Sequence, residues 1–119
     1  MQISYNNKIF SSIKNSESGD VGAEKTFRYR QKGDLVWAEY EGGNVVFGAL
    51  VAKCGKNGVL DMRYQHLNSV GELMTGVCIS TPEILPDGRI RLHEKWRWTC
   101  GDLSKGSSVI EEIIGHTPP

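Results

Sequence analysis

Short runs of alternating hydrophobic and polar residues recur along the chain, with glycine-containing turn signals between them. Successive side chains of a β-strand point to opposite faces, so such runs are typical of strands with one buried face. Glycine and asparagine supply the positive φ that tight hairpins need. The turn signals lie at 16–20, 32–34, 42–44, 55–58, 68–71, 86–88 and 101–102. The pattern predicts about eight strands, at 8–15, 24–31, 34–41, 44–54, 59–67, 72–81, 89–99 and 106–114.

The regular spacing of these strands predicts an all-β fold, an antiparallel up-and-down meander. An open meander would leave two long edges available for association, so we expect the sheet to close into a small barrel. The 119 residues fit one domain, and residues 1–119 are expected to form it. In the segment 106–114, Ser108 to Glu111 also fits a helix capping box. Its β-branched residues favour a closing strand over a helix.

The alternation assigns side chains to faces in several strands. In 24–31, Phe27 and Tyr29 oppose Arg28 and Arg30. In the two longer strands 59–67 and 89–99, the expected inward residues are Leu60, Met62, Tyr64, His66, Ile90, Leu92, Glu94, Trp96 and Trp98. For 34–41 the inward face stays open, so either Tyr40 or Glu39 points inward.

Two features concern the barrel wall itself. Gly48 and Gly76 fall inside predicted strands and suit the bends by which a sheet curls closed. The strand 44–54 is hydrophobic on both faces, so its outer side is expected to be covered by a chain terminus or a partner, with a homodimer as one possibility.

Composition narrows the class of protein. Hydrophobic residues make up 39% of the chain, which is too apolar for a disordered protein. The 14 basic residues equal the 14 acidic ones, which argues against nucleic acid as a partner. The first residues contain no apolar stretch of a signal peptide and no run is long enough to span a membrane, so a cytoplasmic location is expected. Three cysteines without a paired spacing fit reduced thiols.

Catalytic and metal-binding motifs are lacking in the sequence. It contains no nucleophile elbow, no P-loop, no dinucleotide fingerprint and no zinc-protease motif. His66, His93 and His116 do not form a ligand set by spacing, so neither a metal site nor a cofactor is expected.

The candidate site is a set of polar and aromatic residues on faces expected to point inward. A carboxyl group between hydrophobic neighbours is costly unless it has a partner or a task, and Glu94 lies between Leu92 and Trp96. An apolar lining with a few fixed polar groups is typical of a small-molecule pocket. The candidate ligand-binding residues are Glu94, Tyr64, His66, Trp96, Trp98, Tyr40, Tyr29 and Glu39. The alternative is a structural role, with Glu94 hydrogen-bonded inside a filled core.

Four segments carry a family resemblance: VWAEYEGG at 36–43, RYQH at 63–66, GELMTG at 71–76 and GRIRLHEKWRWT at 88–99. Over about residues 8 to 114 the chain resembles a family of small bacterial proteins commonly labelled N-acetylglutamate synthase. The label implies an acetyltransferase, and the resemblance implies no particular catalytic residues. Acetyl-CoA-dependent N-acetyltransferases of the usual kind hold the pyrophosphate on a glycine-rich turn that precedes a helix. No such turn and no βαβ alternation occur here.

Three functional hypotheses follow. The first is a binding protein, similar in architecture to the lipocalin and avidin types, that holds a small molecule inside the barrel. The second is an enzyme on the same barrel with Glu94 or His66 as the acid/base, the two lying about 10 Å apart along a flat sheet. The third is a structural protein with a filled core. A cavity beside Glu94 would separate the first two from the third.

Overall fold

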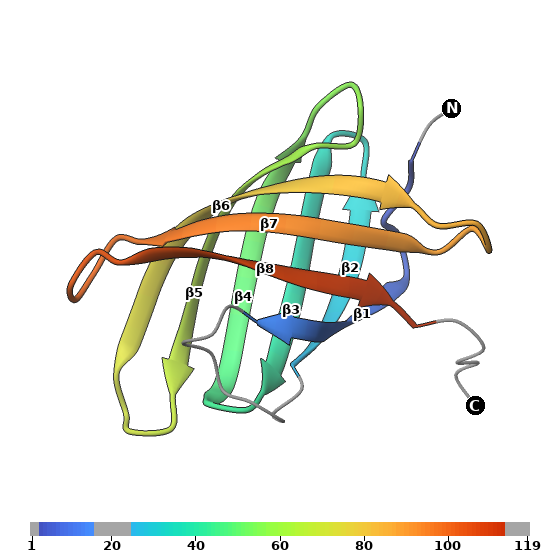
Figure 1. Ribbon diagram of the computed structural model, residues 1–119. Helices are drawn as coiled ribbons and strands as arrows, with labels where there is room; N and C mark the ends of the chain where they lie inside the picture. Colours follow the sequence, from blue (N-terminus) through green and yellow to red (C-terminus); the bar gives the residue numbers. More distant parts are fainter. Residues whose placement is uncertain (1–2, 16–24, 114–119) are drawn as a thin grey trace.

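The computed structural model describes residues 3–15 and 25–113, which form eight β-strands (Figure 1). They are β1 (Lys8–Asn15), β2 (Thr26–Lys32), β3 (Leu35–Gly42), β4 (Val45–Cys54), β5 (Leu60–Asn68), β6 (Leu73–Ile84), β7 (Ile90–Trp98) and β8 (Lys105–Glu112). Each strand pairs antiparallel with the next, and β1 pairs with β8, so the sheet closes on itself. In Figure 1, β6 passes from the rear strands into the front layer that β7 and β8 complete.

The predicted all-β barrel is confirmed, with every predicted strand present and its ends displaced by at most three residues. The segment 106–114 forms a strand through Glu112, because its backbone pairs with both β7 and β1, and the helix alternative is wrong. No described residue is helical, so the α/β fold of the usual N-acetyltransferases is not the fold of this chain. Glu24, Ile114 and the turn predicted at 16–20 lie outside the described residues.

The expected alternation of faces is confirmed in β2, β5 and β7, where the predicted inward residues are buried or half-buried. In β3 the structure resolves the open question of register: Val36, Ala38 and Tyr40 are buried, and Glu39 is exposed. Each side chain is fixed to its face by the pairing of β3 with both β2 and β4, because a shift of one residue would move all of them to the other face.

One end of the barrel is filled by an aromatic plug made of Tyr5, Phe10 and Tyr29, all of them buried. The ring centroids of Phe10 and Tyr29 are 4.9 Å apart, and Tyr5 lies 6.0 Å from Tyr29. Tyr5 precedes β1 and donates its hydroxyl to the backbone carbonyl of Gly58, in the turn between β4 and β5. This contact anchors the segment before β1 across the end of the barrel.

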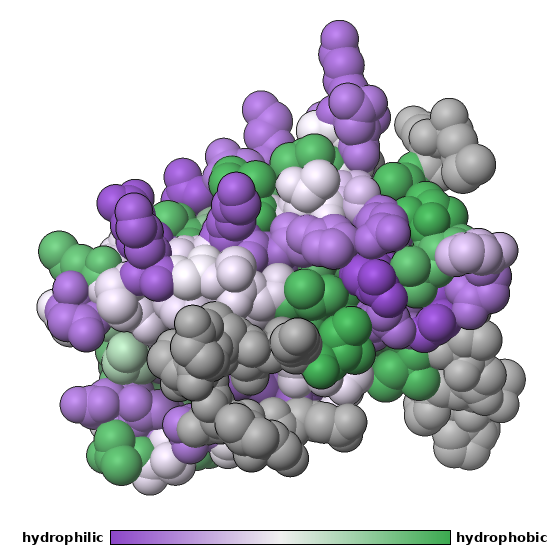
Figure 2. All heavy atoms as spheres, viewed as in Figure 1, coloured by the Kyte–Doolittle hydropathy of each residue, from purple (hydrophilic) through white to green (hydrophobic). Residues whose placement is uncertain are grey.

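The outer surface of the front layer is polar and carries ion pairs. The Glu111 carboxylate on β8 binds Arg89 at 2.7 Å and Arg91 of β7 at 2.8 Å, and the two arginines lower the pKa of Glu111. Long hydrophilic side chains project from this view of the molecule in Figure 2. Among the described residues, no helix is long and apolar enough to cross a membrane.

Candidate functional site

The half of the barrel away from the aromatic plug contains a cavity of about 500 Å³. Protein interiors are close-packed, and voids larger than a water molecule are few, so an opening of this size is unusual in a core. Its lining includes Asn44 and Ser104, from the turns after β3 and β7, and Asn68 at the end of β5, which lie at the lower left of Figure 1. The cavity therefore opens at the end of the barrel opposite Tyr5.

Glu94 of β7 lines this cavity and is only 8% exposed. Its register places it directly opposite Ser80 of β6 on one side and Ser108 of β8 on the other. The Ser108 hydroxyl donates to Oε1 at 3.0 Å, and the Ser80 hydroxyl donates to Oε2 at 3.3 Å. Burial raises the pKa of Glu94 from 4.5 to about 7, although the two serine hydrogen bonds oppose the shift. The carboxyl group can therefore gain or lose a proton near neutral pH.

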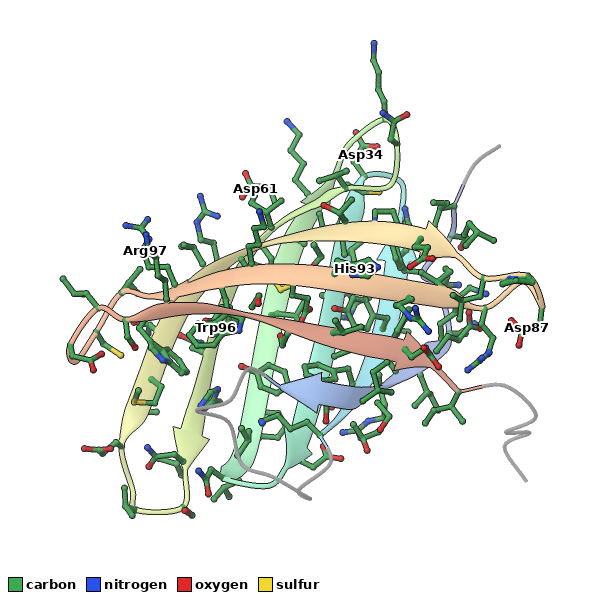
Figure 3. The ribbon with its side chains drawn as sticks, in the orientation of Figure 1. Asp34, Asp61, Asp87, His93, Trp96 and Arg97 are labelled. Atoms are coloured by element: carbon green, nitrogen blue, oxygen red, sulfur yellow. The ribbon has the colours of Figure 1, made fainter. Side chains whose placement is uncertain are left out.

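Aromatic side chains form a continuous wall on the inner face of the barrel. The Trp98 ring lies 5.8 Å from Trp96, 5.7 Å from Tyr64 and 5.6 Å from His66, centroid to centroid. The wall continues from His66 to Tyr40 and on to Phe27. Figure 3 shows Trp96 turned toward the interior, while the neighbouring Arg97 projects away from the barrel.

Three of these rings lie over glycines in the adjacent strand. Tyr40 is paired with Gly48, Tyr64 with Gly76, and Trp96 with Gly106. A Cβ atom at Gly106 would come within 2.6 Å of the Trp96 ring, and one at Gly48 or Gly76 would overlap the ring of its tyrosine.

The absent side chains therefore let the rings lie flat against the sheet and leave the centre of the barrel open. Gly48 and Gly76 had been expected to bend the sheet. The structure shows that they make room for rings.

His66 is positioned by Tyr40, whose hydroxyl lies 2.9 Å from Nδ1. Burial, and secondarily the charge of Lys25, lowers the pKa of His66, so the imidazole is neutral at pH 7. Glu94 hydrogen-bonds to serines of β6 and β8 and His66 to Tyr40, so the two acid/base candidates do not pair with each other. The two groups lie in one cavity as separate polar centres.

Six of the eight candidate residues line the cavity: Glu94, Tyr64, His66, Trp96, Trp98 and Tyr40. Tyr29 does not, because its position on β2 places its ring in the aromatic plug beside Phe10. Its buried hydroxyl has no hydrogen-bond partner within the described part of the chain. Glu39 lies on the outer face, on the opposite side of β3 from Tyr40. Both are therefore corrections to the expected set.

Sequence reasoning missed the two serines that hold Glu94, and it missed Lys25 at the cavity. Ser80 and Ser108 stand out only once the strand register is known, since nothing in their local sequence connects them to residue 94. Lys25 precedes β2, and its backbone pairs with Ser12 of β1. The alternation of the 106–114 segment could have placed Ser108 on the same face as Gly106 and Ile110, but not beside Glu94.

Within residues 3–15 and 25–113, no three His, Cys, Asp or Glu side chains are grouped as a metal site. Cys54, Cys78 and Cys100 are all free thiols. Cys78 lines the cavity next to Ser80, and its burial, followed by the nearby Glu94, raises its pKa to about 12. This thiol is therefore protonated and unreactive at neutral pH.

A family model described as "avidin-like protein" matches residues 3–113, which include every described strand. No curated protein and no solved structure matches the chain.

Proposed function

The chain belongs to the avidin-like family, and on that premise we propose that it binds a small organic molecule in the cavity beside Glu94. The observation that carries the proposal is the cavity itself. Its volume of about 500 Å³ falls within the range of ligand pockets, roughly 300 to 1,000 Å³. A structural protein with a filled core would have no reason to keep this half of the barrel open.

The lining has the composition that small-molecule sites share. Aromatic and aliphatic side chains supply most of the wall, and Leu50 and Met62 complete it on β4 and β5. Polar groups interrupt this wall, and two of them are fixed in place: Glu94 is held by serines and His66 by Tyr40. Such groups orient a ligand, while the apolar wall contributes most of the buried area. A catalytic role for Glu94 would require a substrate in this same cavity, so ligand binding has to be tested before catalysis.

The three tryptophans can show where a ligand binds, because two of them lie inside the cavity and one lies outside it. Trp96 and Trp98 line the cavity, whereas Trp37 lies on the outer face of β3. In NMR spectra of the protein mixed with a library of small fragments, we expect ligands to shift the indole N–H signals of Trp96 and Trp98 and to leave Trp37 unmoved. Trp98→Ala should weaken binding about tenfold or more, because large aromatic contacts dominate binding energies.

The matched control is Trp37→Phe, which should bind the same fragments with unchanged affinity. If no fragment shifts the two inner tryptophans, or if shifts occur at Trp37 alone, the cavity is not a binding site and the proposal is wrong.

A homodimer through β4 is a second proposal, favoured by exposed hydrophobic residues. On the outer side of β4, Val46, Phe47 and Val51 are half exposed or more. Val51 lies opposite Trp37 of β3, and Phe47 lies opposite Leu67 of β5, so the apolar strip extends over three strands. Contiguous exposed apolar surface of this kind is typical of protein association sites.

We expect sedimentation of the wild-type protein to show a dimer or larger assembly at micromolar concentration. Val51→Asp should shift it to the monomer, because the strip would then bury an unpaired charge. Val70→Asp is the control, since Val70 is exposed in the turn after β5. A wild-type protein that sediments as a monomer would contradict this proposal.

A further inference from the structure

The carboxyl group of Glu94 faces the cavity and forms no ion pair among the described residues. Lys25 lines the same cavity and its charge acts on Glu94, but the two groups are not paired. A buried carboxylate in that position is costly, and a ligand that brings a positive charge would remove the cost. We propose that the barrel binds a small organic monocation with an apolar or aromatic body, whose charged head lies against Glu94. The inference rests on the proposed binding function and names the class of ligand.

The surroundings of Glu94 favour its ionised form when a cation is present. Both oxygens accept hydrogen bonds, one from Ser80 and one from Ser108, and both donors come from the strands that flank β7. Hydrogen bonds to the charged form stabilise it, so the two serines hold a carboxylate in a fixed orientation.

The aromatic wall supplies the second feature that a cation requires. Trp96 and Trp98 follow Glu94 on the same face of β7, and Tyr64 lies beside Trp98. The negative face of an aromatic ring attracts a cation, and indole is the strongest of the common rings in this respect. A ligand with a positive head on Glu94 would have its body along these rings.

The other ionisable groups near Glu94 contribute little positive or negative charge at neutral pH. Tyr29, Tyr40, Tyr64 and Cys78 all have raised pKa values, chiefly through burial, and are uncharged. Lys25 is the exception, since its charge acts on both Glu94 and His66. Lys25 disfavours a second positive charge near the cavity, so a monocation should bind better than a dication.

Binding of a cation to the ionised carboxylate should depend on pH. The pKa of Glu94 is about 7, so the carboxyl is mostly protonated at pH 6 and mostly ionised at pH 8. An aliphatic amine stays protonated over this range, as lysine does. The affinity for the amine should therefore rise between pH 6 and pH 8, and binding at pH 6 should release a proton.

The test compares 2-phenylethylamine with 2-phenylethanol, which has the same body but no charge. Isothermal titration at pH 8 should show that the amine binds about tenfold more tightly or better, which is the scale of a hydrogen bond to a charged group. The advantage should shrink at pH 6 and disappear in Glu94→Gln. Glu83→Gln is the matched control, because Glu83 pairs with His93 on the outer surface. It should keep the wild-type preference.

Three outcomes would overturn the inference. They are equal binding of the amine and the alcohol at pH 8, a preference that persists in Glu94→Gln, and no binding of the amine at all. Only the absence of any fragment at Trp96 and Trp98 overturns the proposed function. A cavity that binds neutral fragments but shows no preference for the amine would refute the ligand class and leave the binding function standing.

Discussion

Replacing Gly76 by alanine is expected to lower the free energy of unfolding by about 2 kcal/mol, the usual scale for forcing an added methyl group into a packed site. Elsewhere in a strand the same change would be neutral or stabilising, because alanine is less flexible than glycine in the unfolded chain. At Gly76 the new methyl group would overlap the Tyr64 ring, which lies directly across from it on β5. The ring would have to turn into the cavity, so ligand binding should be lost together with stability.

Three further variants separate this cause from a general loss of stability. Gly55→Ala is the control, since its nearest neighbour to an added Cβ is the Val59 carbonyl at 3.5 Å, an ordinary contact. In a Tyr64→Ala background, Gly76→Ala should cost little, because the ring that the methyl group meets is gone. Urea unfolding of the wild-type protein, Gly76→Ala, Tyr64→Ala and the double variant measures the coupling energy between positions 64 and 76. If Gly76→Ala costs the same with and without the Tyr64 ring, the ring-over-glycine explanation is wrong.

The protein is expected to lose about 3 kcal/mol of stability through Glu94 as the pH rises from 4.5 to 8. The pKa of Glu94 is about 7 in the folded protein and near 4.5 in the unfolded chain. Between these values the folded state holds a proton that the unfolded state releases, so raising the pH favours unfolding. The stabilisation from the protonated Glu94 is complete below pH 4.5, falls as the pH approaches 7, and is absent above pH 7.

Other groups titrate in the same range with the opposite sign. The pKa of His66 is lowered in the folded protein, so His66 stabilises the fold as the pH rises. The measurement is therefore the difference between the wild-type protein and Glu94→Gln in urea unfolding at each pH. Glutamine is uncharged throughout, so its stability relative to wild type should improve by about 3 kcal/mol between pH 4.5 and pH 8. A difference that stays constant with pH would show that Glu94 is not a buried titrating group.

The sequence alone predicted those parts of the structure that depend on neighbours along one strand. The alternation in β7 placed Glu94, Trp96 and Trp98 on the inner face, and their positions follow from the twofold period of a strand. Where alternation was ambiguous, as in β3, the prediction left Glu39 and Tyr40 as alternatives. Only the exposure of Glu39 in the folded chain decides between them.

Features that depend on the register between strands could not be predicted. Ser80 and Ser108 are each 14 residues from Glu94 in the sequence, and they meet it because β6 and β8 pair with β7 in one particular alignment. Similarly, Gly48 in β4 and Gly76 in β6 were recognised from the sequence, but the rings above them were not, and Gly106 in β8 was missed. The sequence also does not show how far along the barrel axis a side chain lies. Tyr29 was therefore included in the predicted site, although it lies in the aromatic plug.

The aromatic plug of Tyr5, Phe10 and Tyr29 closes one end of the barrel, so the cavity does not run through it. Because the hydroxyl of Tyr5 donates to the carbonyl of Gly58 and its ring is completely buried, that end of the barrel is closed. Within residues 3–15 and 25–113, the cavity is open toward the turns after β3 and β7 and the end of β5. A ligand that enters there also leaves there, past the polar side chains of Asn44, Asn68 and Ser104. The dissociation rate of a ligand should therefore depend on residues at the opening that need not contact the bound ligand.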